Sequence, residues 1–422
     1  MGAGSQHVKN TLDKLGIKPN IHQIREYKSA AEMVTLAESS PEARENKEWL
    51  LAENWSMMMQ AFKEDRGLTE EKIVELMNLA LFTAPEAKAA GLVDSVLYWD
   101  ELESMLKGKE KDLRTVSQST YADVKPEKLG LKGSKKIAVV HAYGMIGGRK
   151  SKVDPVFGVM MGHESVIADL RRAQKDKDVA AIVFRVDSRG GESLASDLIG
   201  HEVELISKEK PVVVSMVDVA ASGGYYIAYE ASKLVADPMT ITGSIGSISM
   251  KFNMKGLYDK LGITNDFVEK GPNALLYSDY FDFTPEQRKR FEENHWAGFD
   301  MWLRDVAAHR KMTYEQVTSL ALGRVWTGRQ AKANGLIDEL GGLDKAIEVA
   351  KDLAKIPVDQ KVTVVHFPKK RGLLQMLLGG EGGGMSAAAN WVIYRYVRDD
   401  VAETWSTLNA RNLYMLDEAA VK

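Results

Sequence analysis

The chain has 422 residues, 45% of them hydrophobic and 27% charged, a composition typical of a globular protein with two or three domains. Its 56 basic and 59 acidic residues leave a formal net charge of -3, which gives no electrostatic reason to expect nucleic acid as a partner. The absence of cysteine excludes disulfides, thiolate catalysis and zinc–thiolate sites.

The sequence contains no segment with the length and hydrophobicity of a membrane-spanning helix. Its start, Met1–Gln6, has neither the basic region nor the apolar core of a secretory signal. We therefore expect a soluble chain that carries no membrane anchor and no targeting signal.

Residues 1–106 carry a mainly helical pattern. Segments 41–63 and 69–81 place apolar residues three and four positions apart, and each follows a Ser or Thr suited to cap a helix N-terminus. Residues 107–135 are rich in Lys, Ser, Gly and Pro, which predicts a linker.

From residue 136 the pattern changes to short apolar runs that alternate with helical stretches. It predicts strands at 136–142, 179–187, 211–217 and 233–237, and helices at 161–175, 192–208 and 222–231. Continuous Val and Ile runs separated by helices are typical of parallel strands covered on both faces. The sequence thus predicts an α/β fold with helical arms, in which residues 136–355 form a domain around a parallel sheet.

Residues 356–422 predict one more strand at 361–367, a glycine-rich segment at 379–384 and a helix at 386–407. The glycine-rich segment lacks the GKS or GKT ending of a phosphate loop and the strand that leads into one. We therefore interpret it as a hinge or loop.

Two segments of the chain are repeated. Val8–Ile17 matches Met254–Ile263, 246 residues further on, and Thr83–Asp94 matches Thr327–Asp338 after a gap of two residues. The second copy follows the α/β pattern, whereas the first begins almost at Met1, so we expect a tandem repeat with a truncated first copy. Residues 1–106 would be the C-terminal helical part of that copy.

The two copies differ at one position of chemical interest. At the offset of 246, Lys28 of the first copy falls on Ala274 of the second. Lysine can act as a base when its amine is neutral, and alanine cannot. The difference indicates that the two copies have distinct roles.

Two junctions between a strand and a helix are rich in glycine, at 187–193 and 220–226. Paired glycines let the backbone approach a ligand closely, and the following helix offers unpaired N–H groups to negative charge, as an oxyanion hole requires. Ser222 begins the second helix, where it can be a helix cap or a nucleophile. A nucleophilic serine needs a base within hydrogen-bond reach.

None of the eight histidines lies in a recognisable triad context, and we interpret His141, His163 and His201 as ordinary core or surface residues. No HExxH or similar spacing predicts a metal site. Lys28 is either one of many solvated lysines or a base whose pKa is lowered by burial. Ser244 is either a turn residue or a hydroxyl that orients a lysine.

Three motifs in order, at 187–191, 220–228 and 242–247, closely resemble those of the long, tandem-domain signal peptide peptidases of the S49 serine peptidase family. The resemblance extends from about residue 8 to the predicted C-terminal helix. It implies a ClpP/crotonase-like fold and a Ser–Lys dyad without histidine. In tandem members the C-terminal half supplies the serine and the N-terminal half the lysine, in a context like Tyr27-Lys28-Ser29-Ala30.

Carried over to this chain, the resemblance implies that Ser222 is the nucleophile and Lys28 the general base. Ser244 would orient the lysine amine, and the N–H groups of Gly191 and Gly223 would form the oxyanion hole. The implied activity is that of a serine endopeptidase, without a cofactor, that degrades apolar peptides such as cleaved signal peptides. The family also implies a homo-oligomer, often a tetramer, associated with the bacterial membrane and facing the periplasm.

Two features depart from the family pattern. Arg189 stands where the family usually has proline, and the sheet of the first copy is missing. One alternative is therefore a catalytically inactive S49-like protein that binds peptides or acts as a scaffold. Another is crotonase-like acyl-CoA chemistry, although the glycine-rich loops show no obvious catalytic Asp/Glu pair.

Overall fold

The computed structural model describes residues 2–108, 116–122, 124, 128, 133–154 and 158–368. The described residues fall into two compact units, one within residues 2–53 and 134–368 and the other within residues 54–133. The predicted glycine-rich segment 379–384 and helix 386–407 lie outside the described residues, as does much of the predicted linker 107–135.

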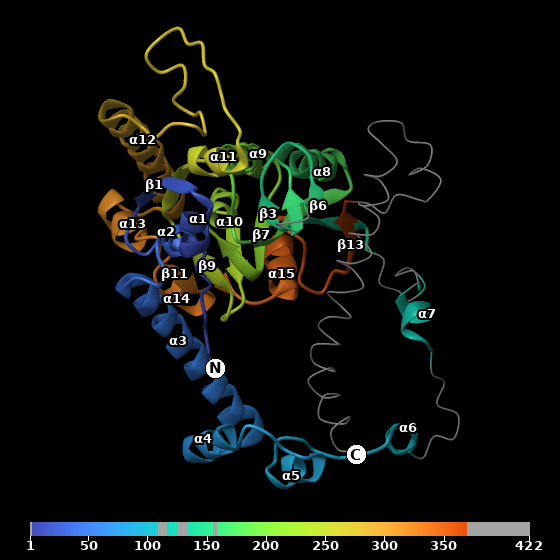
Figure 1. Ribbon diagram of the computed structural model, residues 1–422. Coiled ribbons are helices and arrows are strands. Elements are labelled where there is room, and N and C mark those ends of the chain that lie inside the picture. The colour runs from blue at the N-terminus through green and yellow to red at the C-terminus, as the bar shows by residue number, and fades with distance from the viewer. Residues whose placement is uncertain are drawn as a thin grey trace. The chain divides into compact units, whose positions relative to one another are not determined.

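An eight-stranded sheet forms the centre of the first unit (Figure 1). Its strands are β2 (Lys135–Tyr143), β6 (Val179–Ser188), β7 (Val212–Ala221), β8 (Lys233–Ala236), β9 (Ile241–Gly243), β11 (Val325–Thr327), β12 (Glu339–Leu340) and β13 (Val362–Phe367). The order is β11-β9-β7-β6-β2-β13, with β8 paired to β7 and β12 to β8. Only the β9–β11 pair is antiparallel. The predicted α/β fold with a parallel sheet is confirmed.

Helices cover both faces of this sheet. Helices α8 (His163–Lys175) and α9 (Ser193–Glu209) pack on one face, and α15 (Leu343–Leu353) packs on the other (Figure 1). Phe184 of β6 points into the first core and its neighbour Val183 into the second, and both are fully buried. Burial on both faces explains why these strands appear in the sequence as continuous apolar runs.

Two smaller sheets flank the central one. Strands β3 (Met145–Ile146), β4 (Lys152–Asp154) and β5 (Gly158–Met161) form one of them. In the other, β1 (Lys18–Ile24) pairs antiparallel with β10 (Ser247–Asn253), from Lys18 opposite Asn253 to Ile24 opposite Ser247. Strand β1 corrects the prediction that residues 1–106 are helical.

The repeat in the sequence is also a repeat of helices. Helices α1 (Lys9–Leu15) and α11 (Lys255–Leu261) both end on a left-handed glycine, and their starts lie 246 residues apart. Later pairs start 244 residues apart: α3 (Pro41–Arg66) with α12 (Pro285–Arg310), α4 (Glu70–Leu79) with α13 (Tyr314–Leu320), α5 (Ala84–Ala89) with α14 (Gly328–Ala333), and α6 (Trp99–Lys107) with α15. The short helices α2 (Glu32–Thr35) and α7 (Gln118–Ala122) are not part of these pairs.

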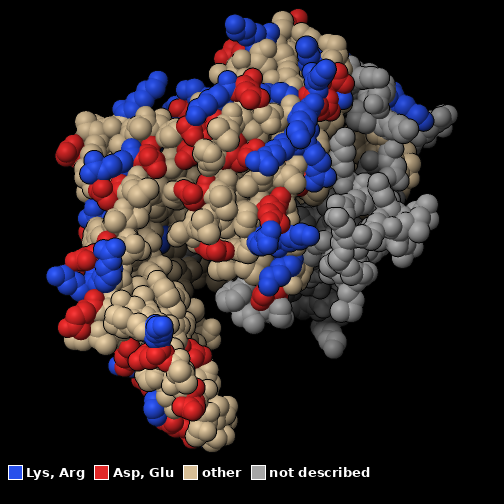
Figure 2. All heavy atoms as spheres, turned by 90° about the horizontal axis from the view of Figure 1, so that it is seen from above, with Lys and Arg blue, Asp and Glu red and all other residues tan. Residues whose placement is uncertain are grey.

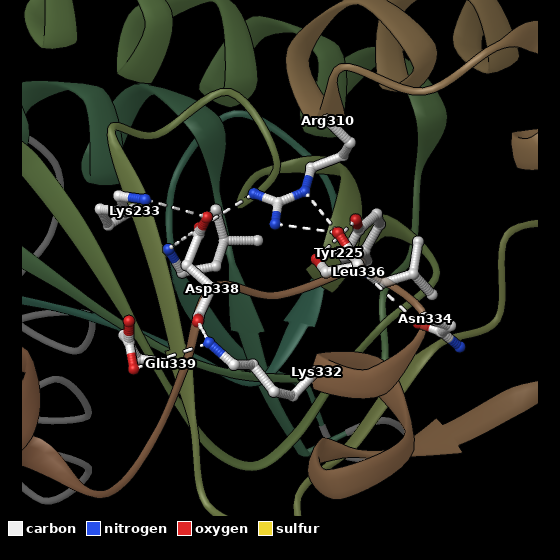
Figure 3. Close-up of polar contacts among 10 residues, drawn as sticks. Tyr225, Lys233, Arg310, Lys332, Asn334, Leu336, Asp338 and Glu339 are labelled. Atoms are coloured by element: carbon white, nitrogen blue, oxygen red, sulfur yellow. Dashed lines mark hydrogen bonds and ion pairs between the residues drawn. The ribbon is translucent and has the colours of Figure 1, made fainter.

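Helix α10 (Gly223–Tyr226) is much shorter than the predicted helix 222–231, because the chain turns after residue 226 towards β8. Its buried Tyr225 donates a hydrogen bond from its hydroxyl to the Leu336 carbonyl, 2.9 Å away (Figure 3). Beside it, Arg310 at the end of α12 pairs with Asp338, with 3.0 Å between Nη1 and Oδ2 (Figure 3). This network fixes the helix that follows Ser222.

No helix in the described part of the chain is both long and apolar enough to cross a membrane. On the face seen in Figure 2, basic and acidic side chains are interspersed. This pattern agrees with the near-neutral composition.

Candidate active site

Ser222 lies at the junction between β7 and α10, at the carboxyl end of a central parallel strand. Its backbone has φ 57° and ψ -121°, a conformation that non-glycine residues rarely adopt and that costs about 1–3 kcal/mol. The Ser222 N–H donates to the Gly243 carbonyl at 2.8 Å, which helps to hold this turn. A sharp turn of this kind between strand and helix presents a serine hydroxyl at the sheet edge, the geometry of the nucleophile elbow in the α/β-hydrolase fold.

Lys28 reaches this serine from the first copy of the repeat. Strand β1 pairs with β10, and Lys28 follows the end of β1 by four residues. Its Nζ lies 2.8 Å from Ser222 Oγ, although the two residues are 194 positions apart in the chain. The structure therefore brings together the two residues that the repeat and the glycine-rich motif singled out.

Lys28 is buried, with 6% of its surface exposed. Two glycines allow this close packing. A Cβ on Gly323 would lie 2.5 Å from the backbone nitrogen of Lys28, and a Cβ on Gly246 would lie 3.1 Å from the side-chain Cδ of Lys28. Within the described residues, no carboxylate forms an ion pair with Lys28. Burial therefore lowers the pKa of Lys28 from 10.5 to about 7, so that a large fraction of the amine is neutral at neutral pH.

Ser244 holds the amine from the other side. Lys28 Nζ donates to the Ser244 carbonyl oxygen at 2.7 Å and to its Oγ at 2.9 Å. Ser244 also has a left-handed backbone, with φ 51°, and its N–H donates to the Arg324 carbonyl at 2.9 Å. With Ser222 Oγ, these contacts give Nζ three oxygen partners in a fixed position.

The two glycine-rich loops meet beside Ser222. Ile146 fixes the first loop, because its N–H donates to the Gly190 carbonyl and its carbonyl accepts the Glu192 N–H, each at 2.9 Å. A Cβ on Gly190 would lie 2.6 Å from the Gly223 nitrogen, and a Cβ on Gly223 would lie 3.0 Å from the Gly191 nitrogen. The glycines are thus required for the loops to approach, and the N–H groups of Gly191 and Gly223 lie near each other and near Ser222. Arg189 is exposed on the first loop.

The histidines that we interpreted as ordinary residues lie in other surroundings. His141 Nε2 is 3.0 Å from His366 Nδ1, and burial lowers the pKa of His141 to about 4. His163 contacts the Gly148 carbonyl, and His201 lies near Glu204. None of these three forms a hydrogen bond with Ser222 in the described part of the structure.

Two residues near Lys28 were not identified from the sequence: Gly323, which packs against its backbone, and Arg324, whose carbonyl accepts the Ser244 N–H. They act through contacts between segments far apart in the chain, and no motif links them to the lysine. Gly246 belongs to the predicted motif 242–247, but its contact with Lys28 was not predicted. Among the described residues there is no group of three or more His, Asp or Glu side chains that could hold a metal ion.

The sequence matches peptidase family S49 over residues 2–114 and 204–357. These two segments together cover more than half of the chain, so the chain belongs to peptidase family S49, as predicted.

The chloroplastic serine protease SPPA of Arabidopsis thaliana is 36% identical over 89% of this chain and 56% of its own length. Protease 4 of Haemophilus influenzae is 32% identical over 84% of this chain and 59% of its own length. The chain thus spans less than two thirds of the length of these curated relatives. A solved ClpP1 variant from Listeria monocytogenes is 16% identical, covers 53% of this chain and 99% of its own, and has a TM-score of 0.33.

Proposed function

We propose that this chain is a serine endopeptidase with a Ser–Lys dyad. The observation that carries the proposal is the 2.8 Å separation between Lys28 Nζ and Ser222 Oγ, in surroundings that lower the pKa of the lysine to about 7. A neutral amine at hydrogen-bond distance can take the proton of a serine hydroxyl as that hydroxyl attacks a carbonyl. S49 membership and relatives named as serine proteases support the same reaction.

In the proposed mechanism, Ser222 Oγ attacks the scissile carbonyl while its proton passes to Lys28 Nζ. The negative oxygen that forms accepts hydrogen bonds from the N–H groups of Gly191 and Gly223, whose loss costs about 10²–10³ in rate in comparable enzymes. Lys28 then gives its proton to the leaving amine, which leaves an acyl-enzyme. A water then attacks this ester while its proton passes to Lys28 Nζ, and Lys28 returns that proton to Ser222 Oγ as the C–O bond breaks and the acid product leaves.

Ser244 has a positioning role in this proposal. Its two oxygens accept hydrogen bonds from Nζ without adding a carboxylate charge, which would stabilise the protonated amine. The lysine is held in place and can still lose its proton near neutral pH.

The family resemblance supports apolar peptides such as cleaved signal peptides as substrates, and a relative from Enterococcus faecium is named as a putative signal peptide peptidase. We also propose a homo-oligomer, tetrameric in the manner of the family, at the periplasmic side of a bacterial membrane. The proposed domain organisation keeps residues 1–106 as part of the first repeat, 107–135 as a linker, 136–355 as the serine-bearing domain and 356–422 as a C-terminal segment.

The test measures peptide hydrolysis and covalent labelling by a fluorophosphonate for the wild type, Ser222→Ala and Lys28→Ala. We expect both variants to remain folded and to lose hydrolysis by at least about 10³-fold. The wild-type rate is expected to rise with pH around a midpoint near 7, as Lys28 loses its proton.

Full activity in Lys28→Ala would contradict the dyad. If the folded wild type were neither labelled nor active on the peptides tested, the alternative hypothesis of an inactive peptide-binding or scaffold protein would be correct.

A further inference from the structure

The segment Leu322–Arg324 contacts the backbone on both sides of the Lys28 amine. It connects α13 of the second copy to β11, and its Leu322 carbonyl accepts the Tyr27 N–H at 3.0 Å, next to Lys28. Its Gly323 N–H donates to the Ile245 carbonyl at 2.9 Å, and its Arg324 carbonyl accepts the Ser244 N–H. One short segment therefore fixes the backbone on both sides of Lys28 Nζ.

The side chain of Arg324 extends this link into the first copy. Its guanidinium carbon lies 4.1 Å from the centre of the Tyr27 ring and 4.8 Å from that of Trp49, and the residue is 8% exposed. It forms an ion pair with Glu45 of α3, and the Tyr27 hydroxyl donates to the same carboxylate at 2.9 Å. These bonds from Tyr27 and Arg324 hold the pKa of Glu45 below its usual value.

We propose, on the basis of the proposed dyad, that Arg324 is a positioning residue that sets the place of Lys28 by holding Tyr27 with its side chain and Ser244 with its carbonyl. Tyr27 precedes the lysine directly, and Ser244 provides two of the three oxygens around its amine. A planar guanidinium can stack on two rings and bind a carboxylate at the same time, which a lysine ammonium cannot do.

The same interface offers a matched control. Arg329, also from the second copy, forms an ion pair with Glu53 of α3, with 2.7 Å between Nε and Oε1. This pair joins the same two copies but does not contact Tyr27, Lys28 or Ser244 within the described structure. Loss of Arg329 should therefore weaken the interface without changing the surroundings of Lys28.

The experiment compares Arg324→Met, Arg324→Lys and Arg329→Met with the wild type. It measures the rate of fluorophosphonate labelling from pH 5 to pH 10, kcat and KM for a peptide, and thermal unfolding. In Arg324→Met we expect water to reach Lys28, and the midpoint of the labelling profile to rise by about one pH unit or more. At pH 7 the labelling rate should then fall about fivefold or more and recover in part at pH 9, with kcat reduced and KM little changed.

Arg324→Lys should behave like Arg324→Met, whereas Arg329→Met should keep the wild-type midpoint whatever its unfolding temperature. If Arg324→Met does not fold, Glu45→Gln removes the charge partner at an exposed position and should shift the midpoint in the same direction by a smaller amount.

The inference is overturned if the wild type is labelled at Ser222 and the folded Arg324 or Glu45 variants keep its profile, or if Arg329→Met shifts the midpoint equally. Failure of the proposed function would differ from this result, because the wild type itself would then not be labelled.

Discussion

Burial of Lys28, the central residue of the site, lowers the stability of the folded state but favours the neutral amine that the proposed reaction uses. A lysine with 6% exposure and no carboxylate partner among the described residues is held mainly by neutral oxygens. Burial penalises the charged form, and this penalty produces the neutral amine that the proposed reaction needs. Replacement of Lys28 should therefore have opposite effects on stability and on activity.

The replacement Lys28→Met removes the charge and keeps an unbranched side chain. We expect the variant to be inactive at every pH and more stable than the wild type at acid pH. The folded state binds the lysine proton more weakly than the unfolded chain does. The penalty is therefore complete below about pH 7 and disappears as the pH rises towards 10.5. The stability gained over the wild type should be greater at pH 6 than at pH 9 by roughly 2–3 kcal/mol, measured by urea unfolding.

The exposed Lys177 provides a control for this experiment, because Lys177→Met should change stability little at either pH. An equal effect of Lys28→Met at pH 6 and pH 9 would show that the amine is not held in its neutral form.

The sequence indicated Ser222 and Lys28 by different signals, one from a glycine-rich junction and one from the mismatch between two copies. It did not indicate that Lys28 lies against Gly246 and Gly323, because this contact depends on how three distant segments fold together. The depth of burial, and with it the pKa of the lysine, follows from that packing. The sequence could therefore predict the two residues of the proposed dyad, but not the protonation state of the lysine.

At the scale of the elements, the sequence predicted the strands that are buried in the core. It did not predict the strand whose conformation depends on pairing with a distant segment. The parallel strands were predicted because burial on both faces leaves continuous apolar runs. Strand β1 was not predicted, because only Asn20 and Ile24 of its seven residues are buried and its conformation comes from pairing with β10. Helix α10 was predicted too long because the apolar run after Gly224 continues into buried turns rather than into a helix.

The network around Asp338 lies next to the Leu336 carbonyl that binds Tyr225 of α10, and it permits a test at this scale (Figure 3). Burial raises the pKa of Asp338, but the bond and charge of Arg310, the Leu234 N–H and Lys233 together lower it below its usual value. The Arg310 side chain is only 8% exposed, so Arg310→Met leaves a carboxylate without its main partner. We expect this change to cost about 1–3 kcal/mol in the free energy of unfolding, because Lys233 and the Leu234 N–H still bind the carboxylate.

A double-mutant cycle with Asp338→Leu measures the coupling. The double variant should be clearly more stable than the sum of the two single losses predicts, because no unpaired buried charge remains. Strict additivity of the two single effects would show that the pair makes no net contribution to the support of α10.

At the scale of the whole molecule, the two copies of the repeat share helices but differ in the residues that the proposed dyad uses. Helices α3 and α12 both have 26 residues, and each begins with proline 244 positions from the other. Only the first copy has the lysine, and the serine lies in the α/β part that precedes the second copy. In the proposed dyad, the two copies therefore contribute to one composite site.

This division predicts how inactive variants behave when they are combined. In the structure, Lys28 and Ser222 of the same chain meet, so a site that lacks either residue cannot be completed by its own chain. Purified Lys28→Ala and Ser222→Ala should therefore both be inactive, and a mixture should stay inactive in peptide hydrolysis, even after unfolding and refolding together.

Each variant mixed with the wild type serves as a control and should retain the activity of the wild-type share. If oligomers instead exchanged the segment from β1 to Lys28, a chain with intact Ser222 could receive the lysine of a neighbour, and the mixture would recover up to about a quarter of the wild-type activity by random pairing. Such recovery would show that β1 pairs with β10 of another chain, because the lysine can reach a second serine only if the strand that leads to it moves as well.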